Sequence, residues 1–449
     1  MPKIFGTDGI RGEANHHPMD GAFIFSLGQA LADFLRSRNP QPQVVIGRDT
    51  RISGPMLESA LAAGLMSMGA VPLLAGVLPT PGIAFMTKST QADAGIVISA
   101  SHNPYQDNGI KIISRDGFKL SDSDEETIED LVFDKALKNK CPSAANLGRS
   151  CTLVDAERRY IDFLKSIFPR QLSMRGMKIV LDTANGATYN VAPGVFSEMG
   201  AMVHVIHNHP DGININDHCG SQHTQDLEKE VLAKAASVGL AFDGDGDRLI
   251  AVDEKGCKLT GDQILVICAK VMKDLGLLKN NLLVTTVMSN SGLRMACKRY
   301  GLRHHASKVG DRYVIEEMQR LGGSLGGEDS GHMIFLDHHT TGDGILAALQ
   351  LIGAMLRTEK TLSELAGWME LYPQELINVR VKSKPEISTV PEIVDVITQA
   401  EKDLCEQGRV LVRYSGTENL CRVMVEGPTK ETALKHCSRI ADRVKSVLG

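Results

Sequence analysis

Short apolar runs alternate with amphipathic helical segments along the first third of the chain. The residue pattern predicts buried strands at 44–47, 71–75 and 94–98, with helices at 23–37 and 55–68. Strands that alternate with helices assemble into an α/β sheet whose strands are largely parallel. Ligands of such sheets bind beyond the carboxyl ends of the strands, so polar residues directly after each strand are the first candidates for a functional site.

The alternation of predicted strands and helices resumes in two later parts of the chain, and the residue pattern changes after Pro373. The 449 residues are too many for one typical domain, which contains about 100–200 residues. The sequence therefore predicts an α/β protein with three similar α/β/α domains built on mixed sheets, followed by a smaller α+β domain. Their predicted bounds are 1–150, 151–255, 256–372 and 373–449.

Composition excludes several classes of function. The chain carries 49 basic and 54 acidic residues, a net charge of −5, which gives no support for nucleic acid or a membrane surface as the main partner. No apolar run reaches the roughly 18 residues of a membrane-spanning helix, and the first residues lack the apolar core of a signal peptide. The nine cysteines are scattered, without a Cys-x-x-Cys pair. We therefore expect a cytoplasmic protein whose partner is a small molecule.

A serine at the end of a predicted strand is the first candidate for chemistry. The strand at 94–98 runs into an Asn-Pro turn that contains Ser101 and His102, and the next apolar run, 109–113, carries Lys111. A hydroxyl on a rigid strand end, with an imidazole and a cation close by, suits a nucleophile or a phosphoryl carrier. Taken alone, the same residues are also compatible with an ordinary turn.

Three carboxylates occupy alternate positions in the segment 243–247, where Asp243, Asp245 and Asp247 are separated by glycines. Like charges this close repel unless a cation lies among them. Oxygen ligands with open positions favour Mg²⁺, with a phosphate oxygen completing the shell. The spacing also matches much of an EF-hand calcium loop. That alternative fails because Arg248 stands where the loop needs glycine and because the flanking runs predict strands instead of helices.

Two other segments suggest metal binding less strongly. Histidines at 204, 207 and 209 lie close together, but the sequence places no acidic or cysteine partner at a fixed spacing from them. The acidic run 121–126 is more typical of a capped helix start, where negative charge is favourable, than of a metal site.

Two glycine-rich turns supply groups that bind sugars and phosphates. The first exposes Glu328, Ser330 and His332 together, a suitable set for sugar hydroxyls. The second, 413–419, combines an arginine, two hydroxyls and several backbone N–H groups between two predicted strands, and Arg422 can add to it. Such a turn predicts a phosphate-binding nest, although a plain hairpin with surface charge is the alternative.

Together these motifs indicate phosphoryl transfer on a phosphorylated small molecule. No Gly-Lys-Ser/Thr sequence occurs, which excludes a P-loop NTPase. The Gly-x-Ser-x-Gly match at 322–326 is not followed by a predicted helix, as a hydrolase elbow requires. Catalysis would then depend on positioning and on charge stabilisation more than on covalent activation.

The motifs at 7–12, 100–104, 243–248, 328–332 and 413–418 resemble those of the α-D-phosphohexomutase superfamily, in the same order. The match is closest to its bacterial branch that acts on glucosamine phosphate, and it covers essentially the whole chain. The resemblance implies four domains around a central cleft. Two positions depart from the usual pattern. Asn419 replaces a proline, and Asp329 replaces a glutamine, where the extra charge either favours an ammonium-bearing sugar or is neutral.

The resemblance also implies a role for each site residue. Ser101 would carry the phosphoryl group as phosphoserine and supply one oxygen to Mg²⁺. The other implied assignments are Asp243, Asp245 and Asp247 as Mg²⁺ ligands, Arg11 and Arg248 as stabilisers of the transferring group, His102 beside the serine, and Lys111 and His332 as proton-transfer groups. Those for the substrate are Glu328 and Ser330 on the sugar hydroxyls, Asp311 and Arg312 in a sugar-selecting loop, and Arg413, Ser415, Gly416, Thr417 and Arg422 on the non-reacting phosphate.

The implied activity is that of an isomerase which moves a phosphate between two positions of one sugar. Phosphoserine would donate to the 1-hydroxyl of glucosamine 6-phosphate, and glucosamine 1,6-bisphosphate would turn around and return its 6-phosphate to Ser101. The product would feed the synthesis of UDP-N-acetylglucosamine, and a homodimer is a candidate assembly. The alternatives are a phosphomannomutase/phosphoglucomutase, a non-catalytic sugar-phosphate sensor and a magnesium-dependent phosphatase.

Overall fold

The structure, a computed structural model, describes every residue except 1–3, 7, 135, 406 and 416–418. The chain forms two compact units. One contains Met1–Val287 and His305–Ala366, and the other contains Met288–His304 and Gly367–Gly449. The predicted domain bounds stay predictions, because one compact unit can hold several domains.

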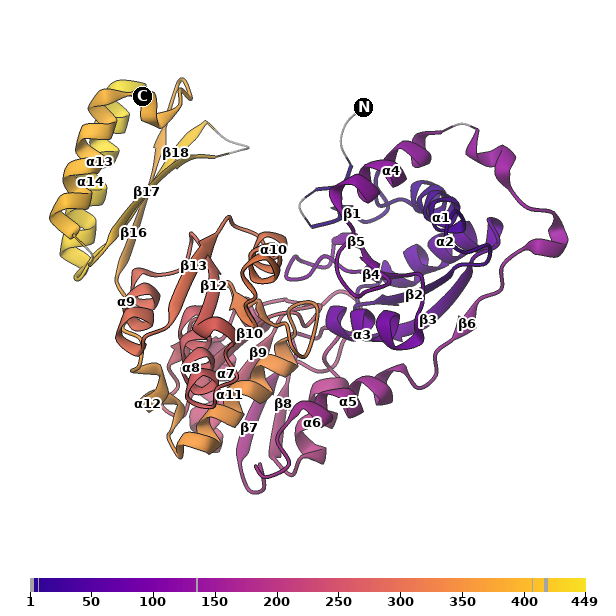
Figure 1. The fold of residues 1–449 in the computed structure, drawn as a ribbon, viewed down its shortest axis with the longest axis horizontal. Coiled ribbons are helices and arrows are strands. Elements are labelled where there is room, and N and C mark those ends of the chain that lie inside the picture. Colours follow the sequence, from indigo (N-terminus) through magenta and orange to yellow (C-terminus); the bar gives the residue numbers. More distant parts are fainter. Residues whose placement is uncertain (1–3, 7, 135, 406, 416–418) are drawn as a thin grey trace. The chain divides into compact units, whose positions relative to one another are not determined.

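The first group of elements in the larger unit is built on a six-stranded sheet in the order β1-β5-β4-β2-β3-β6 (Figure 1). β4 pairs in parallel with β2 and antiparallel with β5, so the sheet reverses direction beside the Ser101 segment. The predicted strands and helices of this region are confirmed, with small shifts of their ends. The strands are β1 Ile10–Glu13, β2 Gln43–Arg48, β3 Val71–Val77, β4 Ala94–Ile98, β5 Asp107–Ser114 and β6 Cys151–Thr152, and the helices are α1 Gly21–Arg36, α2 Gly54–Ser67, α3 Thr80–Thr90 and α4 Asp122–Phe133.

Both faces of this first sheet are covered by helices, which explains why its central strands are apolar throughout. Val44 and Ile46 of β2 join a core formed with α1, α2 and α4. Successive side chains of a strand point to opposite faces, so Val45 and Gly47 face the other way. There, a Cβ added to Gly47 would meet Ile83 of α3 at 2.8 Å. Figure 1 shows α3 on the opposite side of the sheet from α1 and α2.

The second group is a five-stranded mixed sheet in the order β11-β10-β9-β7-β8. β9 and β10 are antiparallel neighbours, and the segment with the three aspartates connects them. These strand flanks confirm that the segment is not an EF-hand. The elements are α5 Ala156–Ile167, β7 Lys178–Asp182, α6 Val191–Glu198, β8 Met202–Ile206, α7 Gln225–Lys234, β9 Val238–Phe242, β10 Leu249–Asp253 and β11 Lys258–Leu259.

The third group surrounds a four-stranded sheet in the order β13-β12-β14-β15. Thr260 and Gln263 form a capping box at the start of α8, as the Thr-x-x-Gln spacing favours. β14 continues into an antiparallel partner and not into a helix, which confirms that the Gly-x-Ser-x-Gly match is no hydrolase elbow. The elements are α8 Gly261–Asp274, β12 Leu282–Thr286, β13 Arg303–Ser307, α10 Asp311–Leu321, β14 Leu325–Gly327, β15 Met333–Phe335, α11 Gly344–Thr358 and α12 Leu362–Ala366.

The smaller unit has an antiparallel sheet in the order β16-β18-β17, packed against α13 and α14. This arrangement confirms the predicted α+β texture after residue 373. Helix α9 belongs to the same unit, where the backbone N–H and hydroxyl of Ser291 donate to Glu426 Oε2 at 2.8 and 2.7 Å. The elements are α9 Ser291–Tyr300, β16 Gln374–Arg380, α13 Pro391–Leu404, β17 Arg409–Tyr414, β18 Leu420–Glu426 and α14 Lys430–Leu448.

Short 3₁₀ helices complete the described fold at Leu137–Lys140, Ala144–Asn146, Gly220–Gln222, Lys279–Asn281 and Ile387–Thr389. The acidic run 121–126 is a capped helix start, as predicted, since the Ser121 hydroxyl accepts the N–H of Asp124 at the start of α4. Among the described residues, no helix combines the length and the apolar character needed to cross a membrane.

Candidate active site

Ser101 lies in a tight turn directly after β4, where the sequence placed it. Its side chain is almost completely buried, and its backbone adopts a left-handed conformation with φ of 54°. A serine pays steric strain in that region, so surrounding contacts must hold it there. One such contact is local, because the hydroxyl of Ser99 accepts the backbone N–H of Ser101 at 3.0 Å.

A fully buried arginine supports the turn through hydrogen bonds to its backbone carbonyls. The guanidinium of Arg51 donates to the carbonyl oxygens of Ser101 and Asn103, both at 2.9 Å, and to that of Asp107 at 3.0 Å. The guanidinium also donates to the carbonyl of the proline that follows Asn103, and Arg51 Nε lies 2.8 Å from Asp49 Oδ2. Burial raises the pKa of Asp49, and the contact with Arg51 opposes that shift. The ion pair is therefore a buried support for the turn.

The three aspartates form the wall opposite Ser101. The Ser101 hydroxyl donates to Asp243 Oδ2 at 2.6 Å. All three carboxylates are buried, and one oxygen from each lies within 4.8 Å of the others. Close approach of the two loops depends on Gly244, since a Cβ there would meet the carbonyl oxygen of Ser101 at 2.5 Å.

This carboxylate cluster passes a simple test for a divalent cation. Asp245 Oδ1 and Asp247 Oδ1 are buried without a hydrogen-bond partner in the described part of the chain. Buried acceptors of this kind are costly unless something binds them. Burial, followed by the charges of Asp247 and Asp245, raises the pKa of Asp243 well above its usual range. An oxygen-only set with unsatisfied lone pairs fits a hard cation such as Mg²⁺.

Cations surround these carboxylates. Lys111 Nζ lies 3.2 Å from both Asp245 Oδ2 and Asp8 Oδ2, and 3.7 Å from Asp247 Oδ2. Burial opposes the charge of Lys111, but these carboxylates outweigh it and raise the lysine pKa well above the usual value. The surrounding carboxylates therefore favour the charged form of Lys111.

Two arginines frame the same space. Arg11 donates to Asp8 and, at 3.1 Å, to the carbonyl oxygen of Ala100 beside the serine. Arg248 Nε lies 3.8 Å from Asp247 Oδ1 and 4.0 Å from Asp243 Oδ2. Each arginine thus lies next to one of the two loops that meet at Ser101, where charge would develop during phosphoryl transfer.

The two histidines differ in their surroundings. His102 Nδ1 lies 3.4 Å from the Ser101 hydroxyl, and burial, followed by the charges of Arg248 and Arg11, lowers the pKa of His102. The buried His332 has Nε2 at 3.8 Å from Asp247 Oδ2 and from Asp311 Oδ2. Neither ring nitrogen of His332 makes a hydrogen bond within the described residues.

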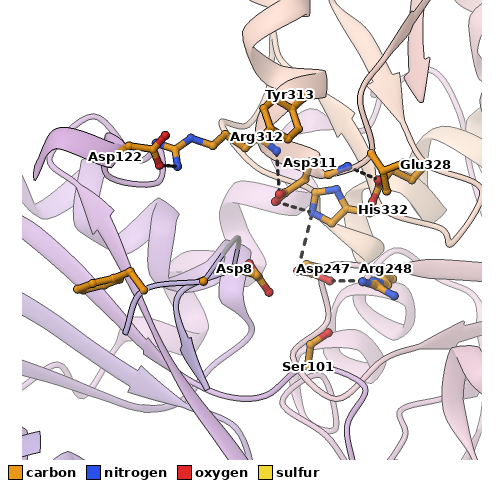
Figure 2. Close-up of a pocket in the computed structure, with 14 residues that line it drawn as sticks. Asp8, Ser101, Asp122, Asp247, Arg248, Asp311, Arg312, Tyr313, Glu328 and His332 are labelled. Atoms are coloured by element: carbon orange, nitrogen blue, oxygen red, sulfur yellow. Dashed lines mark hydrogen bonds and ion pairs between the residues drawn. The ribbon is translucent and has the colours of Figure 1, made fainter. Parts of the chain in front are cut away.

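A cavity of about 500 Å³ opens above Ser101 (Figure 2). Figure 2 shows Asp8, Asp247 and His332 pointing into the same space from three different segments, with Arg248 beside Asp247. The lining residues are Phe5, Gly6, Asp8, Ser101, Asp122, Asp247, Arg248, Val309, Gly310, Asp311, Arg312, Tyr313, Glu328 and His332. The predicted serine, one metal residue and most of the predicted sugar residues therefore line this cavity, and the other two aspartates lie beside Asp247. Ser330 is exposed and does not line it.

The predicted sugar-selecting residues hold one another in place. Asp311 and Arg312 open helix α10. Glu328 Oε1 accepts the N–H of Gly310 at 3.1 Å, which fixes the turn before that helix. Arg312 donates to Asp122, a contact visible in Figure 2.

One of the two unusual positions has a local explanation. The carboxylate of Asp329 accepts the N–H of Asp262 in the first turn of α8 at 3.2 Å. An acceptor and negative charge at a helix N-terminus stabilise the helix. Nothing in the structure explains Asn419.

The predicted phosphate nest lies in the smaller unit. Arg413 of β17 and Arg422 of β18 are cross-strand neighbours, so the two arginine side chains leave the sheet from adjacent positions. The Ser415 N–H donates to the carbonyl of Leu420 at 2.9 Å, which closes the hairpin. Gly416 and Thr417 lie outside the described residues.

Several residues of the site were not predicted. Asp8 and Lys119 extend the charged network, with Lys119 Nζ at 2.6 Å from Asp8 Oδ1 and 2.8 Å from Asp311 Oδ2. Thr80 donates to Asp245 at 2.7 Å, and Asn216 Nδ2 donates to the Ser101 carbonyl at 2.9 Å. Arg51 had a signal in the sequence, since it follows the strand at 44–47, but nothing there indicated which loop it supports.

Comparison with known proteins identifies the class. Family models for phosphoglucomutase/phosphomannomutase match residues 2–139 as α/β/α domain I, 158–256 as domain II, 260–372 as domain III and 376–443 as the C-terminal domain. The chain belongs to the phosphoglucomutase/phosphomannomutase family, within the phosphohexomutase superfamily. The predicted fold class, four domains with mixed α/β sheets, is confirmed.

Individual relatives narrow the comparison. The chain is 64% identical to a phosphoglucosamine mutase of Syntrophobacter fumaroxidans and 58% identical to one of Syntrophus aciditrophicus, over the full length of each protein. A phosphoglucomutase/phosphomannomutase family protein from Burkholderia thailandensis has the same fold, with a TM-score of 0.80 at 23% identity over 99% of this chain and 97% of that one. Aspergillus fumigatus N-acetylphosphoglucosamine mutase, solved with GlcNAc-6P and magnesium, also has this fold. The TM-score is 0.71 at 17% sequence identity, over 99% of this chain and 96% of that one.

Proposed function

We propose that this protein is a phosphoglucosamine mutase, an isomerase that interconverts glucosamine 6-phosphate and glucosamine 1-phosphate through a phosphoserine at Ser101. The observation that carries the proposal is the 2.6 Å hydrogen bond from the Ser101 hydroxyl to Asp243, within a buried carboxylate cluster that faces a polar cavity. The full-length identity to proteins of that name supports the choice of sugar.

Ser101 accepts and donates the phosphoryl group. In the first half-reaction the bond between phosphorus and the Ser101 oxygen breaks while a bond to the sugar 1-oxygen forms, and the proton of that hydroxyl must leave. His332 is the acceptor that fits, since it lines the cavity and its ring nitrogens lack hydrogen bonds in the described structure. Lys111 stays charged and stabilises the transferring group together with Arg11 and Arg248.

Asp243, Asp245 and Asp247, with an oxygen of phosphorylated Ser101, are proposed to hold Mg²⁺. When bound, the ion supplies positive charge against the phosphoryl oxygens and polarises the phosphorus. The acceptors without hydrogen bonds on Asp245 and Asp247 support this assignment.

Substrate recognition is assigned to two sets of residues. Glu328, Ser330, Asp311 and Arg312 bind or orient the sugar. The second set, Arg413, Ser415, Gly416, Thr417 and Arg422, grips the phosphate that does not react. One fixed phosphate site suits this reaction, because glucosamine 1,6-bisphosphate must present either end to Ser101.

The test is phosphorus NMR of the protein with Mg²⁺ and a trace of sugar 1,6-bisphosphate, in parallel tubes of glucosamine, glucose and mannose 6-phosphate. We expect the glucosamine tube to form its 1-phosphate fastest, and the Ser101→Ala protein to form none. Faster conversion of glucose or mannose would keep the mechanism and change the sugar. If the protein released only free phosphate, and Ser101→Ala released it too, the protein would be a phosphatase and not a mutase. Absence of turnover would favour a sugar-phosphate sensor.

A further inference from the structure

Three side chains of metal-binding type meet outside the cavity. Asp182 ends β7, His207 follows β8, and Cys219 precedes the 3₁₀ helix Gly220–Gln222. One ligand atom from each lies within 4.8 Å of the other two. Asp182 and Cys219 are buried, whereas the His207 side chain is 26% exposed, which leaves one approach from solvent. No motif in the sequence joins these residues, because they are separated along the chain.

The histidine faces the carboxylate without completing a good bond. His207 Nδ1 lies 3.1 Å from Asp182 Oδ2, yet this buried nitrogen has no aligned hydrogen-bond partner among the described residues. His207 also adopts a left-handed backbone conformation with φ of 50°. Asparagine or glycine occupies such positions with less strain. A buried nitrogen without a hydrogen-bond partner among the described residues, next to a buried carboxylate and thiol, favours a bound ligand.

The outer contacts of this cluster are those of a metal site. Asp182 Oδ1 accepts the N–H of Ala184 and Oδ2 accepts that of Gly220, both at 2.9 Å. The second ring nitrogen of His207, Nε2, lies 3.7 Å from a carboxylate oxygen of Asp226. Ligating carboxylates are commonly held by hydrogen bonds, and ligating histidines commonly direct their other nitrogen to a carboxylate. Both features exist here before any ion binds.

We propose that Asp182, His207 and Cys219 bind one Zn²⁺ ion, with water as the fourth ligand. A set of one oxygen, one nitrogen and one sulfur favours zinc over Mg²⁺, which takes oxygen ligands. Bonds of about 2.0–2.3 Å in a tetrahedron place ligand atoms roughly 3.3–3.8 Å apart. The side chains therefore need only small rotations to close around the ion.

The ion would act on the site through structure and would take no part in phosphoryl transfer. The carbonyl oxygen of His207 accepts the N–H of Asn185 at 2.6 Å and the hydroxyl of Thr183 at 2.8 Å. Three residues before Cys219, the side chain of Asn216 holds the carbonyls of Ser101 and Asn103 at 2.9 and 3.0 Å. Zn²⁺ would fix both ends of the segment that supports the Ser101 turn.

The test uses full-length protein treated with a chelator and then saturated with Mg²⁺, so that the aspartate cluster is occupied. Co²⁺ is added as a spectroscopic substitute, and Zn²⁺ stoichiometry is measured by elemental analysis. We expect one ion per chain and a thiolate-to-cobalt absorption band. Cys219→Ser should abolish the band, and His207→Gly, which suits the backbone, should weaken binding by about tenfold or more. The matched control is His204→Gln, in the strand β8 that precedes His207, and it should bind as the wild type does.

A wild-type protein without the band, or a band that survives in Cys219→Ser, would overturn the proposal and leave a simple Asp182–His207 ion pair. If Cys219→Ser does not fold, X-ray absorption of the zinc-loaded wild type decides. One sulfur at about 2.3 Å with nitrogen and oxygen neighbours supports the site, and a shell without sulfur refutes it. Ser101→Ala should bind Zn²⁺ normally, so this inference and the mutase proposal can fail separately.

Discussion

Replacing Arg51 with lysine tests how far the Ser101 turn depends on its buried support. The arginine makes five hydrogen bonds, one to Asp49 and four to carbonyl oxygens of the turn and the segment after it. A lysine keeps the charge but has three donors at one atom, so at least two of these hydrogen bonds are lost. The carbonyls of Ser101 and Asn103 keep Asn216 as a second donor, and that of the following proline keeps the N–H of Asp107. Since a buried group without any partner costs about 1–3 kcal/mol, we expect a loss of about 1–3 kcal/mol in the free energy of unfolding.

The effect on catalysis should exceed a general loss of stability. The hydrogen bond from Arg51 to the Ser101 carbonyl is one of the contacts that hold the left-handed backbone of Ser101, and a displacement of about 1 Å at a reacting group can cost roughly 100-fold in rate. We expect Arg51→Lys to lower the single-turnover rate of phosphoryl transfer from phosphorylated enzyme by about that factor. The KM for the sugar phosphate should change little, because Arg51 does not line the cavity.

The assay is rapid quench with ³²P-labelled enzyme, at a temperature where circular dichroism shows both proteins folded. The matched control is Arg48→Lys, three residues earlier, since Arg48 is partly exposed and contacts Glu58 at 3.3 Å. A folded Arg51→Lys protein that transfers phosphate at the wild-type rate would refute the reasoning, as would an equal loss in Arg48→Lys.

Three other predictions follow from the same geometry. Asp245→Asn removes a charged oxygen from the cluster, so the Mg²⁺ concentration for half-maximal turnover should rise by at least tenfold; an unchanged magnesium titration counts against the ligand assignment. Gly244→Ala places a Cβ 2.5 Å from the Ser101 carbonyl and should abolish most activity, whereas Gly353→Ala in α11, with contacts no closer than 3.9 Å, should be neutral or slightly stabilising in thermal denaturation. Burial raises the pKa of Asp343 to about 6 in the folded protein, from about 3.8 in the unfolded chain, so the protonated carboxyl favours folding. This contribution to the free energy of unfolding is fully present below pH 3.8 and is lost as the pH rises through 6. Asp343→Asn should therefore gain stability relative to wild type, by up to about 3 kcal/mol, between pH 4 and 7 in urea titrations; a pH-independent difference would exclude this.

The sequence predicted the elements well because periodicity reports local burial. Strands such as β2 are apolar on both faces because helices cover both sides, and the motif residues stand where strands end. The same reasoning placed Ser101 and Asp243 at turns and proposed a metal at the aspartates. It could not show that these two turns touch, because their approach depends on contacts between residues far apart in the chain.

Charge networks and metal-type clusters were harder to predict for a physical reason. Lys119 joins Asp8 to Asp311 across three separate segments, and His207 meets Asp182 and Cys219 only through the order of the strands. A pattern in the sequence carries no such distances. The sequence offered no acidic or cysteine partner for the histidines at 204, 207 and 209, whereas the structure places Asp182 and Cys219 beside His207. Spacing along the chain could not show this, because it does not limit spacing in the fold.

The support of Ser101 constrains how the enzyme can move. The turn belongs to the first sheet, yet its carbonyl oxygen is held by Asn216, and its hydroxyl by Asp243, both from the second group of elements. A third contact joins the same two groups, because the hydroxyl of Thr50 in the first group donates to the carbonyl of Asn185 in the second at 2.5 Å. Separating the two groups would break all three contacts and release the strained turn. We therefore expect any opening that admits a sugar phosphate to leave these two groups together.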